Sequence, residues 1–71
     1  MDEYFKSFGN NLKAMRTEKK MTLAELSRQS GVGLTAISNY EALRVLPTLY
    51  NAKMIADAFG ITVDEMLKKR E

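Results

Sequence analysis

The sequence predicts an all-α protein with five short helices. Over most of its 71 residues, apolar side chains recur at intervals of three and four, which places them on one face of a helix. Only four glycines and one proline interrupt this pattern, and no strand is predicted. A chain of this length is expected to form a single domain, residues 1–71, with a small core.

The first helix is expected at about residues 4–19. Its apolar side is expected to enter the core. This side carries Phe5, Phe8, Leu12 and Met15. Gly9 lies inside the segment, where a glycine is expected to lower helix stability by a modest amount.

The second helix is expected at residues 22–30 and the third at about residues 34–43. Thr22 and Glu25 form the capping-box pattern Thr-x-x-Glu, in which the hydroxyl accepts a hydrogen bond from the Glu25 amide and the carboxylate accepts one from the Thr22 amide. Gly33 is a tolerable N-cap for the third helix.

The residues between these two helices suit a close crossing. Ser27 is small enough for the next helix to pack against it at a steep angle, and Gly31 can adopt the positive φ that reverses the chain in about three residues. The later helix is then anchored by Val32, Ile37 and Tyr40. This pattern predicts a helix-turn-helix. Its outward side, where function is expected, carries Leu34, Thr35, Ser38 and Asn39.

The fourth helix is expected at about residues 48–59. Pro47 disfavours helix at the residue before it, so a new element begins there, and Gly60 is a natural residue to follow a helix end. The side expected to face the core carries Leu49, Ile55, Ala56 and Phe59.

The fifth helix is expected to begin at a second capping box, formed by Thr62 and Glu65. Its core side is expected to carry Val63, Met66 and Leu67. Its last turn is expected to hold the cations that a helix dipole favours, Lys68, Lys69 and Arg70.

The composition argues against catalysis. The chain has no cysteine and no histidine, so it lacks thiolate ligands, disulfides and the commonest metal ligand and general base. Its carboxylates are scattered beside lysines, which is typical of a solvated surface. We therefore expect no enzyme activity, no metal and no cofactor.

The charge distribution favours an anionic partner. Between Lys13 and Lys53, seven basic residues stand against three acidic ones, an excess of +4, although the whole chain carries only +2. No basic start leads into an apolar run, and no apolar stretch approaches about 18 residues. No membrane association is expected, and the protein is expected in the cytoplasm.

The stretch from Phe8 to Leu67 resembles the Cro and phage-repressor-like (XRE) helix-turn-helix family. The matching segments are GNNLKAMR (9–16), MTLAEL (21–26), SGV (30–32), ISNYE (37–41), Pro47 and IADAFGITVDEML (55–67). The resemblance implies a five-helix lambda-repressor-like DNA-binding domain, with its third helix in the major groove and its second across the backbone. It implies a sequence-specific transcriptional regulator that represses a phage or mobile-element promoter in a bacterial or phage-infected cell.

The resemblance also implies which residues contact the bases. These positions are Leu34, Thr35, Ser38 and Asn39. Asn39 can pair with adenine N6 and N7, while Thr35 and Leu34 can contact a thymine methyl group. No arginine, lysine or glutamine projects from this helix before Arg44, so the direct contacts are expected to favour A·T pairs. The alternative is an ordinary solvated helix face.

Contacts to phosphates and one internal ion pair are implied in the same way. The expected phosphate contacts are the Thr22 hydroxyl, the amides of Leu23 and Ala24, and the side chains of Arg44, Lys13, Lys20 and Lys53. Each lysine is equally well explained as plain surface. Arg16 and Glu41 match family positions that form a partly buried ion pair with a structural role.

The chain departs from the family at two places. Leu23 stands where relatives usually carry a phosphate-binding glutamine, and the loop after the third helix reads EALRVLP in place of glycine and basic residues. Because Ala42 and Leu43 are strong helix formers, the third helix is expected to extend.

The loop therefore adds unusual apolar character at Leu43, Val45 and Leu46, close to Leu34. We favour a loop that folds inward and enlarges the core. The alternative is an exposed patch for a protein partner, which would make the chain a protein-interaction module or antitoxin with weak or lost DNA binding.

A symmetric homodimer is expected on a near-palindromic operator in double-stranded DNA. Two recognition helices would then lie about 34 Å apart in successive major grooves. The expected interface is the end of the fifth helix and the turn before it. Its candidate contacts, each equally suited to the core, are Tyr50, Met54 and Met66.

Overall fold

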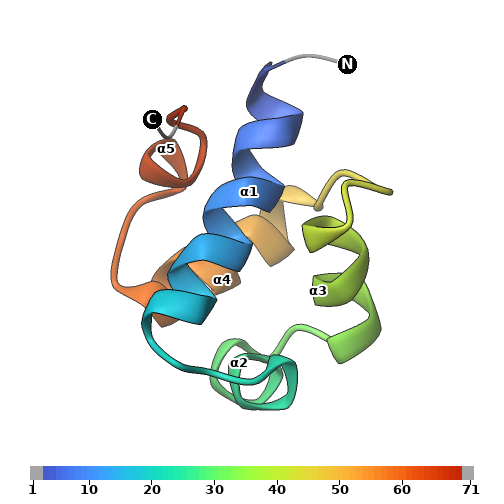
Figure 1. Ribbon diagram of the computed structural model, residues 1–71, viewed down its shortest axis with the longest axis vertical. Helices are drawn as coiled ribbons and strands as arrows, with labels where there is room; N and C mark the ends of the chain where they lie inside the picture. Colours follow the sequence, from blue (N-terminus) through green and yellow to red (C-terminus); the bar gives the residue numbers. More distant parts are fainter. Residues whose placement is uncertain (1–2, 70–71) are drawn as a thin grey trace.

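The computed structural model describes residues 3–69, and within this range it contains five α-helices and no strand (Figure 1). The all-α, five-helix prediction is confirmed. The helices are α1 (Glu3–Glu18), α2 (Leu23–Ser30), α3 (Leu34–Glu41), α4 (Leu49–Phe59) and α5 (Val63–Met66).

The long helix α1 runs through the middle of the molecule, with α3 and α5 packed on it (Figure 1). The helix α2 packs on α3 and α4, and α4 packs on α5. Each of the five helices places at least one side chain completely, or almost completely, inside one shared core. These side chains are Phe8, Leu12, Leu26, Ile37, Ile55 and Met66.

Both predicted capping boxes are present. The Thr22 hydroxyl accepts from the Glu25 amide at 3.1 Å, and the Glu25 carboxylate accepts from the Thr22 amide at 2.7 Å. The equivalent distances for Thr62 and Glu65 are 3.1 Å and 3.0 Å. The hydrogen bond from each threonine amide lowers the pKa of its glutamate partner below the ordinary value.

Two non-glycine residues close helix ends in the left-handed conformation. Lys20 after α1 has φ +57°, and Leu43 after α3 has φ +59°. At α3, the Arg44 amide donates to the Asn39 carbonyl at 3.0 Å and the Leu43 amide donates to the Tyr40 carbonyl at 3.1 Å. This is the Schellman pattern, which usually carries glycine at the position of Leu43. The predicted extension of α3 to residue 43 is therefore wrong, because the Schellman turn ends the helix at Glu41.

Gly9, inside α1, has a packing role that was not predicted from the sequence. Gly9 is buried, and a Cβ atom built on it would lie 2.4 Å from the Tyr40 carbonyl oxygen and 2.4 Å from Leu43 Cδ2. Because Gly9 has no side chain, α1 can approach the end of α3 closely. Gly9 therefore affects helix packing as well as the stability of α1.

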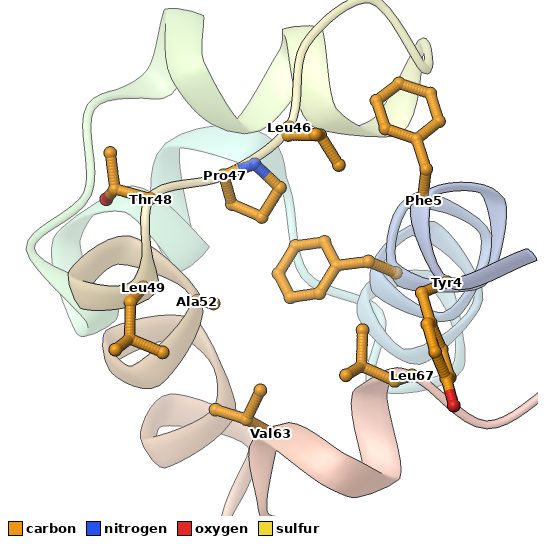
Figure 2. A pocket seen from close by; sticks show the side chains of 10 residues that line it. Tyr4, Phe5, Leu46, Pro47, Thr48, Leu49, Ala52, Val63 and Leu67 are labelled. Atoms are coloured by element: carbon orange, nitrogen blue, oxygen red, sulfur yellow. The ribbon is translucent and has the colours of Figure 1, made fainter. Parts of the chain in front are cut away.

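Two predictions about α4 and α5 need correction. Leu49 was expected in the core but is 80% exposed, because it lies at the edge of an open pocket (Figure 2), whereas Ala52 and Ile55 further along α4 are buried. The helix α5 is a single turn that ends at Met66, so Lys68 and Lys69 follow it, and Arg70 lies outside the described residues.

Candidate nucleic-acid interface

The pair Arg16 and Glu41 fixes α3 against α1. Arg16 Nε lies 2.7 Å from Glu41 Oε2, and Arg16 Nη2 lies 3.0 Å from Glu41 Oε1, so the contact is bidentate. The two side chains are only 17% and 9% exposed. The hydrogen bond with Glu41 raises the pKa of Arg16 above its ordinary value, against the opposing effect of burial.

The same guanidinium also reaches the start of α2. Arg16 Nη1 donates to the Met21 carbonyl oxygen at 2.7 Å. Arg16 therefore joins the last turn of α1, the segment that leads into α2 and the last residue of α3.

The turn between α2 and α3 is tightly hydrogen-bonded. Gly31 has φ +78°, and its amide donates to the Ser27 carbonyl at 2.9 Å. The Ser27 hydroxyl donates to the Val32 carbonyl at 2.6 Å, and the Val32 amide donates to the Ser30 hydroxyl at 3.1 Å. With Val32 buried, the turn holds α2 and α3 in one fixed arrangement. The predicted helix-turn-helix is confirmed.

The inward side of α3 is fixed to three other helices. Ile37 and Tyr40 are buried, and the Tyr40 ring meets the Phe8 ring edge-on, with centroids 6.2 Å apart. The Tyr40 hydroxyl accepts from Asn51 Nδ2 at 2.9 Å, which links α3 to α4. The opposite side of α3 is left toward solvent.

The outward side of α3 carries the four residues predicted to contact bases. Leu34 and Thr35 are exposed, with Leu34 at 44%, and Ser38 and Asn39 are half-buried. Asn39 Oδ1 accepts from Arg44 Nη1 at 3.3 Å. The amide oxygen of Asn39 therefore already accepts one hydrogen bond, and a paired contact with adenine would use its second lone pair together with the Nδ2 group.

The N-terminus of α2 carries the first group of predicted phosphate contacts. Leu23 and Ala24 are the first two helical residues, so their amides have no acceptor within the helix. Leu23 packs against the core, and the Thr22 hydroxyl already caps the helix. The Glu25 carboxylate lies at the same end of α2, where its negative charge opposes that of a phosphate.

The predicted cationic contacts do not all have the same surroundings. Lys20 directly precedes the α2 cap and Arg44 follows α3, so both flank the helix-turn-helix. Lys13 is exposed on α1. Lys53 on α4 forms an ion pair with Asp57 at 2.9 Å, which reduces its availability for phosphate.

The loop between α3 and α4 folds inward only in part. Leu43 is half-buried with its Cδ2 close to Gly9, whereas Val45 is 45% and Leu46 66% exposed. The favoured prediction holds for Leu43 and is wrong for the other two. The physical reason is that the Schellman turn directs Leu43 toward α1 and leaves the following residues outside the core.

One of the predicted dimer contacts is excluded by burial. Met66 has no exposed surface and lies inside the core. Tyr50 is 70% exposed and Met54 is half-buried, so these two remain accessible.

Asn11 has a structural role that was not predicted from the sequence. Its side chain is 1% exposed, and Nδ2 donates to the carbonyl oxygens of Met66 and Lys68, at 2.7 Å each. Asn11 therefore secures the end of α5 to α1. A signal was present, because position 11 falls on the same side of the helix as Phe8, Leu12 and Met15.

Within residues 3–69, no cluster of three or more histidine, cysteine, aspartate or glutamate residues is arranged to hold a metal ion. None of the helices in that range has the length and apolar character needed to cross a membrane.

A family model described as helix-turn-helix, HTH_3, matches residues 12–66, which include all of α2, α3, α4 and α5. The chain belongs to this helix-turn-helix family. The match also covers Arg16, Glu41 and the loop between α3 and α4.

Two curated relatives of this helix-turn-helix protein are transcription factors. The chain is 36% identical over 64 residues to the HTH-type transcriptional activator BcrR of Enterococcus faecalis, covering 90% of this chain and 31% of BcrR. It is 40% identical over 45 residues to the cryptic phage CTXphi transcriptional repressor RstR of Vibrio cholerae, covering 63% of this chain and 40% of RstR. The chain thus spans well under half the length of both relatives.

A solved structure with a similar fold is the restriction-modification controller protein C.AhdI from Aeromonas hydrophila. The two structures superpose with a TM-score of 0.80 at 26% identity, covering 87% of this chain and 94% of C.AhdI. A controller protein of almost the same extent therefore shares the arrangement of these five helices.

Proposed function

We propose that this helix-turn-helix protein binds double-stranded DNA as a sequence-specific transcriptional regulator and reads the major groove with α3. The observation that carries the proposal is the fixed position of α3. Its inward side is held by Ile37, Tyr40 and the Arg16–Glu41 pair, while its outward side faces solvent. A helix held in this way can enter a groove without losing order, and the membership in the helix-turn-helix family supports this use.

The proposed base contacts are made by Leu34, Thr35, Ser38 and Asn39. The proposed backbone contacts are made by Thr22, Leu23, Ala24, Arg44, Lys13, Lys20 and Lys53. Because the first group contains no arginine or lysine, direct reading of guanine is weak and A·T pairs dominate the recognised sequence.

The Asn39→Ala variant should weaken binding to the preferred operator by about 1–3 kcal/mol and relax the preference at one base pair. The measurement is a titration of the selected duplex and of duplexes changed at single positions. Asn10→Ala, an exposed asparagine on α1, is the matched control and should leave the specificity unchanged. An Asn39→Ala variant that keeps the full specificity ratio would remove Asn39 from the reading residues.

The Glu25→Gln variant should bind DNA more tightly. Glutamine keeps the capping box but removes a negative charge beside the first amides of α2. For a charge about 5 Å from a phosphate in water, removing the repulsion should raise the affinity by a small factor, about fourfold at most. The gain should shrink as salt rises, because exposed charges are screened. Equal affinity at low salt would show that no phosphate approaches this end of α2.

The regulator is proposed to act as a homodimer on a near-palindromic operator and to repress by occlusion in the cytoplasm of a bacterial or phage-infected cell, with residues 1–71 as one domain. The relative RstR is a phage transcriptional repressor, which supports the proposal that this chain represses a phage or mobile-element promoter. BcrR is an activator, so repression rather than activation is a separate part of the proposal.

The proposal is tested by selection from a random duplex pool at about 50 and 200 mM salt, followed by sequencing of the bound fraction. Enrichment of an inverted repeat, with affinity that falls steeply with salt, is the expected result. Retention without enrichment would restrict the function to backbone binding.

A second candidate function is a protein-interaction module or antitoxin. It is favoured by the exposure of Leu34, Val45 and Leu46, at 44%, 45% and 66%. No retention on DNA at either salt concentration would support this alternative and overturn the first proposal.

A further inference from the structure

The side chain of Arg44 is held against the outward side of α3 by Asn39. Arg44 Nη1 donates to Asn39 Oδ1 at 3.3 Å, and the Arg44 amide donates to the Asn39 carbonyl oxygen at 3.0 Å. The second bond belongs to the Schellman turn, in which the left-handed Leu43 reverses the chain. Two hydrogen bonds to one residue therefore place a guanidinium beside the proposed base contacts, although Arg44 lies beyond the end of α3.

Most of the hydrogen-bonding capacity of this guanidinium is available to a ligand. A guanidinium has five N–H donors, and Asn39 accepts from one of them. No ion pair within residues 3–69 involves Arg44, so its Nε and Nη2 groups remain available. In Arg16 the same two groups form the bidentate contact with Glu41. Arg44 can therefore bind a pair of acceptor atoms in the same way.

A guanidinium in this position lies near base edges when Asn39 contacts adenine. The second lone pair of Asn39 Oδ1 can accept from adenine N6 at about 3 Å. Since Arg44 Nη1 is 3.3 Å from the same oxygen, it would lie within about 6 Å of that adenine. Successive base pairs are about 3.4 Å apart, so the neighbouring pair is within reach. The phosphates line the rims of a groove about 12 Å wide and about 8.5 Å deep, so the base edges are the nearer targets.

From this geometry we infer that Arg44 reads a guanine and that Asn39 positions it. Arg44 Nε and Nη2 donate to guanine O6 and N7, the commonest specific contact to a base, while Asn39 pairs with the adjacent adenine. The inference rests on the proposed function and deepens it. It transfers Arg44 from the backbone contacts to the base contacts and adds one G·C pair to an operator otherwise rich in A·T pairs.

The contact also favours one orientation of the Asn39 amide. Because Arg44 is a donor, it holds the oxygen of that amide, and not the nitrogen, on its own side. Hydrogen bonds from a charged donor are stronger than those between neutral groups, and Asn39 is half-buried, so this orientation is favoured before DNA binds. Each residue therefore prepares the other for its base, and their contributions to DNA affinity should not be additive.

The alternative role for Arg44 is a phosphate contact, and the two roles differ in their measurable effects. Loss of a base-reading arginine weakens binding about fivefold or more and relaxes the preference at one base pair. Loss of a phosphate-contacting cation weakens binding to all sequences alike, and it lowers the slope of log affinity against log salt by about 1. The preference at single base pairs therefore decides between the two roles.

The test measures binding of Arg44→Ala to the duplex selected from the random pool and to duplexes changed at single base pairs, at about 50 and 200 mM salt. Arg44 is exposed, so the variant should fold, which a thermal melt verifies. Arg28→Ala is the matched control, because it removes the same side chain from an exposed position on α2. We expect Arg44→Ala to lose about fivefold or more on the selected duplex, together with the preference for one G·C pair, and the control to keep that preference.

Two further variants test the paired donors and the positioning by Asn39. Arg44→Lys keeps the charge but not the fork of donors, so it should keep the salt slope and still weaken the preference for guanine. The double variant Asn39→Ala with Arg44→Ala should lose less affinity than the product of the two single losses, because either change alone already disrupts the pair.

Either of two results would overturn the inference. One is an Arg44→Ala variant that keeps all base preferences of the natural chain, whether or not it binds every duplex more weakly. The other is a double variant whose loss of affinity equals the product of the single losses, since Asn39 would then not position Arg44. A natural chain that binds no duplex at either salt concentration would contradict the proposed function as well, so the two failures are distinguishable.

Discussion

The Gly9→Ala variant should unfold at a clearly lower temperature than the natural protein. The added Cβ would lie 2.4 Å from the Tyr40 carbonyl oxygen, a backbone atom that can move only if α3 moves. Overpacking of this kind typically costs about 1–3 kcal/mol, while the better helix propensity of alanine returns roughly 0.8–1 kcal/mol. A clash with a backbone atom belongs in the upper part of this range, so the net loss is about 1–2 kcal/mol. Since each kcal/mol shifts Tm by about 4–8 °C in a domain of this size, a fall of about 4–16 °C is expected.

The comparison that isolates this effect is Asn10→Ala, the neighbouring exposed position on α1. It makes a similar favourable change to helix propensity without a clash and should therefore raise Tm by a few degrees. The double variant Gly9→Ala with Leu43→Ala removes the contact with Leu43 Cδ2 but not the one with the Tyr40 carbonyl. It should therefore remain unstable, and a melt of Gly9→Ala that matches that of Asn10→Ala would refute the close approach of α1 and α3.

The Arg16→Met variant should lose about 3 kcal/mol of unfolding free energy, the lower part of the range for breaking a buried pair. Methionine leaves the Glu41 carboxylate, at 9% exposure, without its bidentate partner. It also leaves the Met21 carbonyl without the donor that lies 2.7 Å away. Chemical denaturation measures this loss, which represents a large fraction of the total stability of a small domain.

Two further variants separate the charge effect from packing. Arg16→Met combined with Glu41→Leu removes both charges and should recover most of the loss, because a buried pair is worth little more than the apolar side chains that replace it. Lys53→Met breaks an ion pair whose side chains are 61% and 49% exposed, so it should cost less than about 0.5 kcal/mol. If Arg16→Met costs no more than Lys53→Met, the pair has no structural role.

Features that depend on neighbouring residues could be predicted from the sequence. The capping boxes of Thr22 and Thr62 bring together groups three residues apart, and the left-handed Gly31 is set by the turn that contains it. Periodicity also identified the buried positions of most helices. The five-helix fold and the helix-turn-helix followed from these local signals.

Features that depend on distant contacts could not be predicted in the same way. Periodicity placed Leu49 on the core side of its helix, but it cannot show that no other element covers that turn. Helix propensity favoured an extension through Leu43, which the Schellman turn and the contact with Gly9 override. The close packing at Gly9 likewise depends on a carbonyl 31 residues further along the chain.

In the candidate site, too, some features could be predicted from the sequence and others could not. The sequence identified Arg16 and Glu41 through the family resemblance, and the structure places them 2.7 Å apart. The base-contacting and phosphate-contacting residues stay predictions, because surface exposure alone does not distinguish a reading face from a solvated one. The hydrogen bond between Asn39 and Arg44 is a feature of this surface that could not be predicted from the sequence.

The short length of α5 affects how easily this part of the molecule unfolds locally. Four residues cannot form a stable helix alone, so the order of α5 depends on burial of Met66 and on the Asn11 amide, a partner 55 residues away in the chain. Local unfolding of this segment therefore requires less free energy than unfolding of the helix-turn-helix. Val63 and Leu67 line an open apolar pocket that also contacts α1 and α4, so local unfolding of α5 would remove one wall of this pocket. Any molecule that binds this pocket only while α5 is folded would stabilise the segment, so its binding and the ordering of α5 would be thermodynamically coupled.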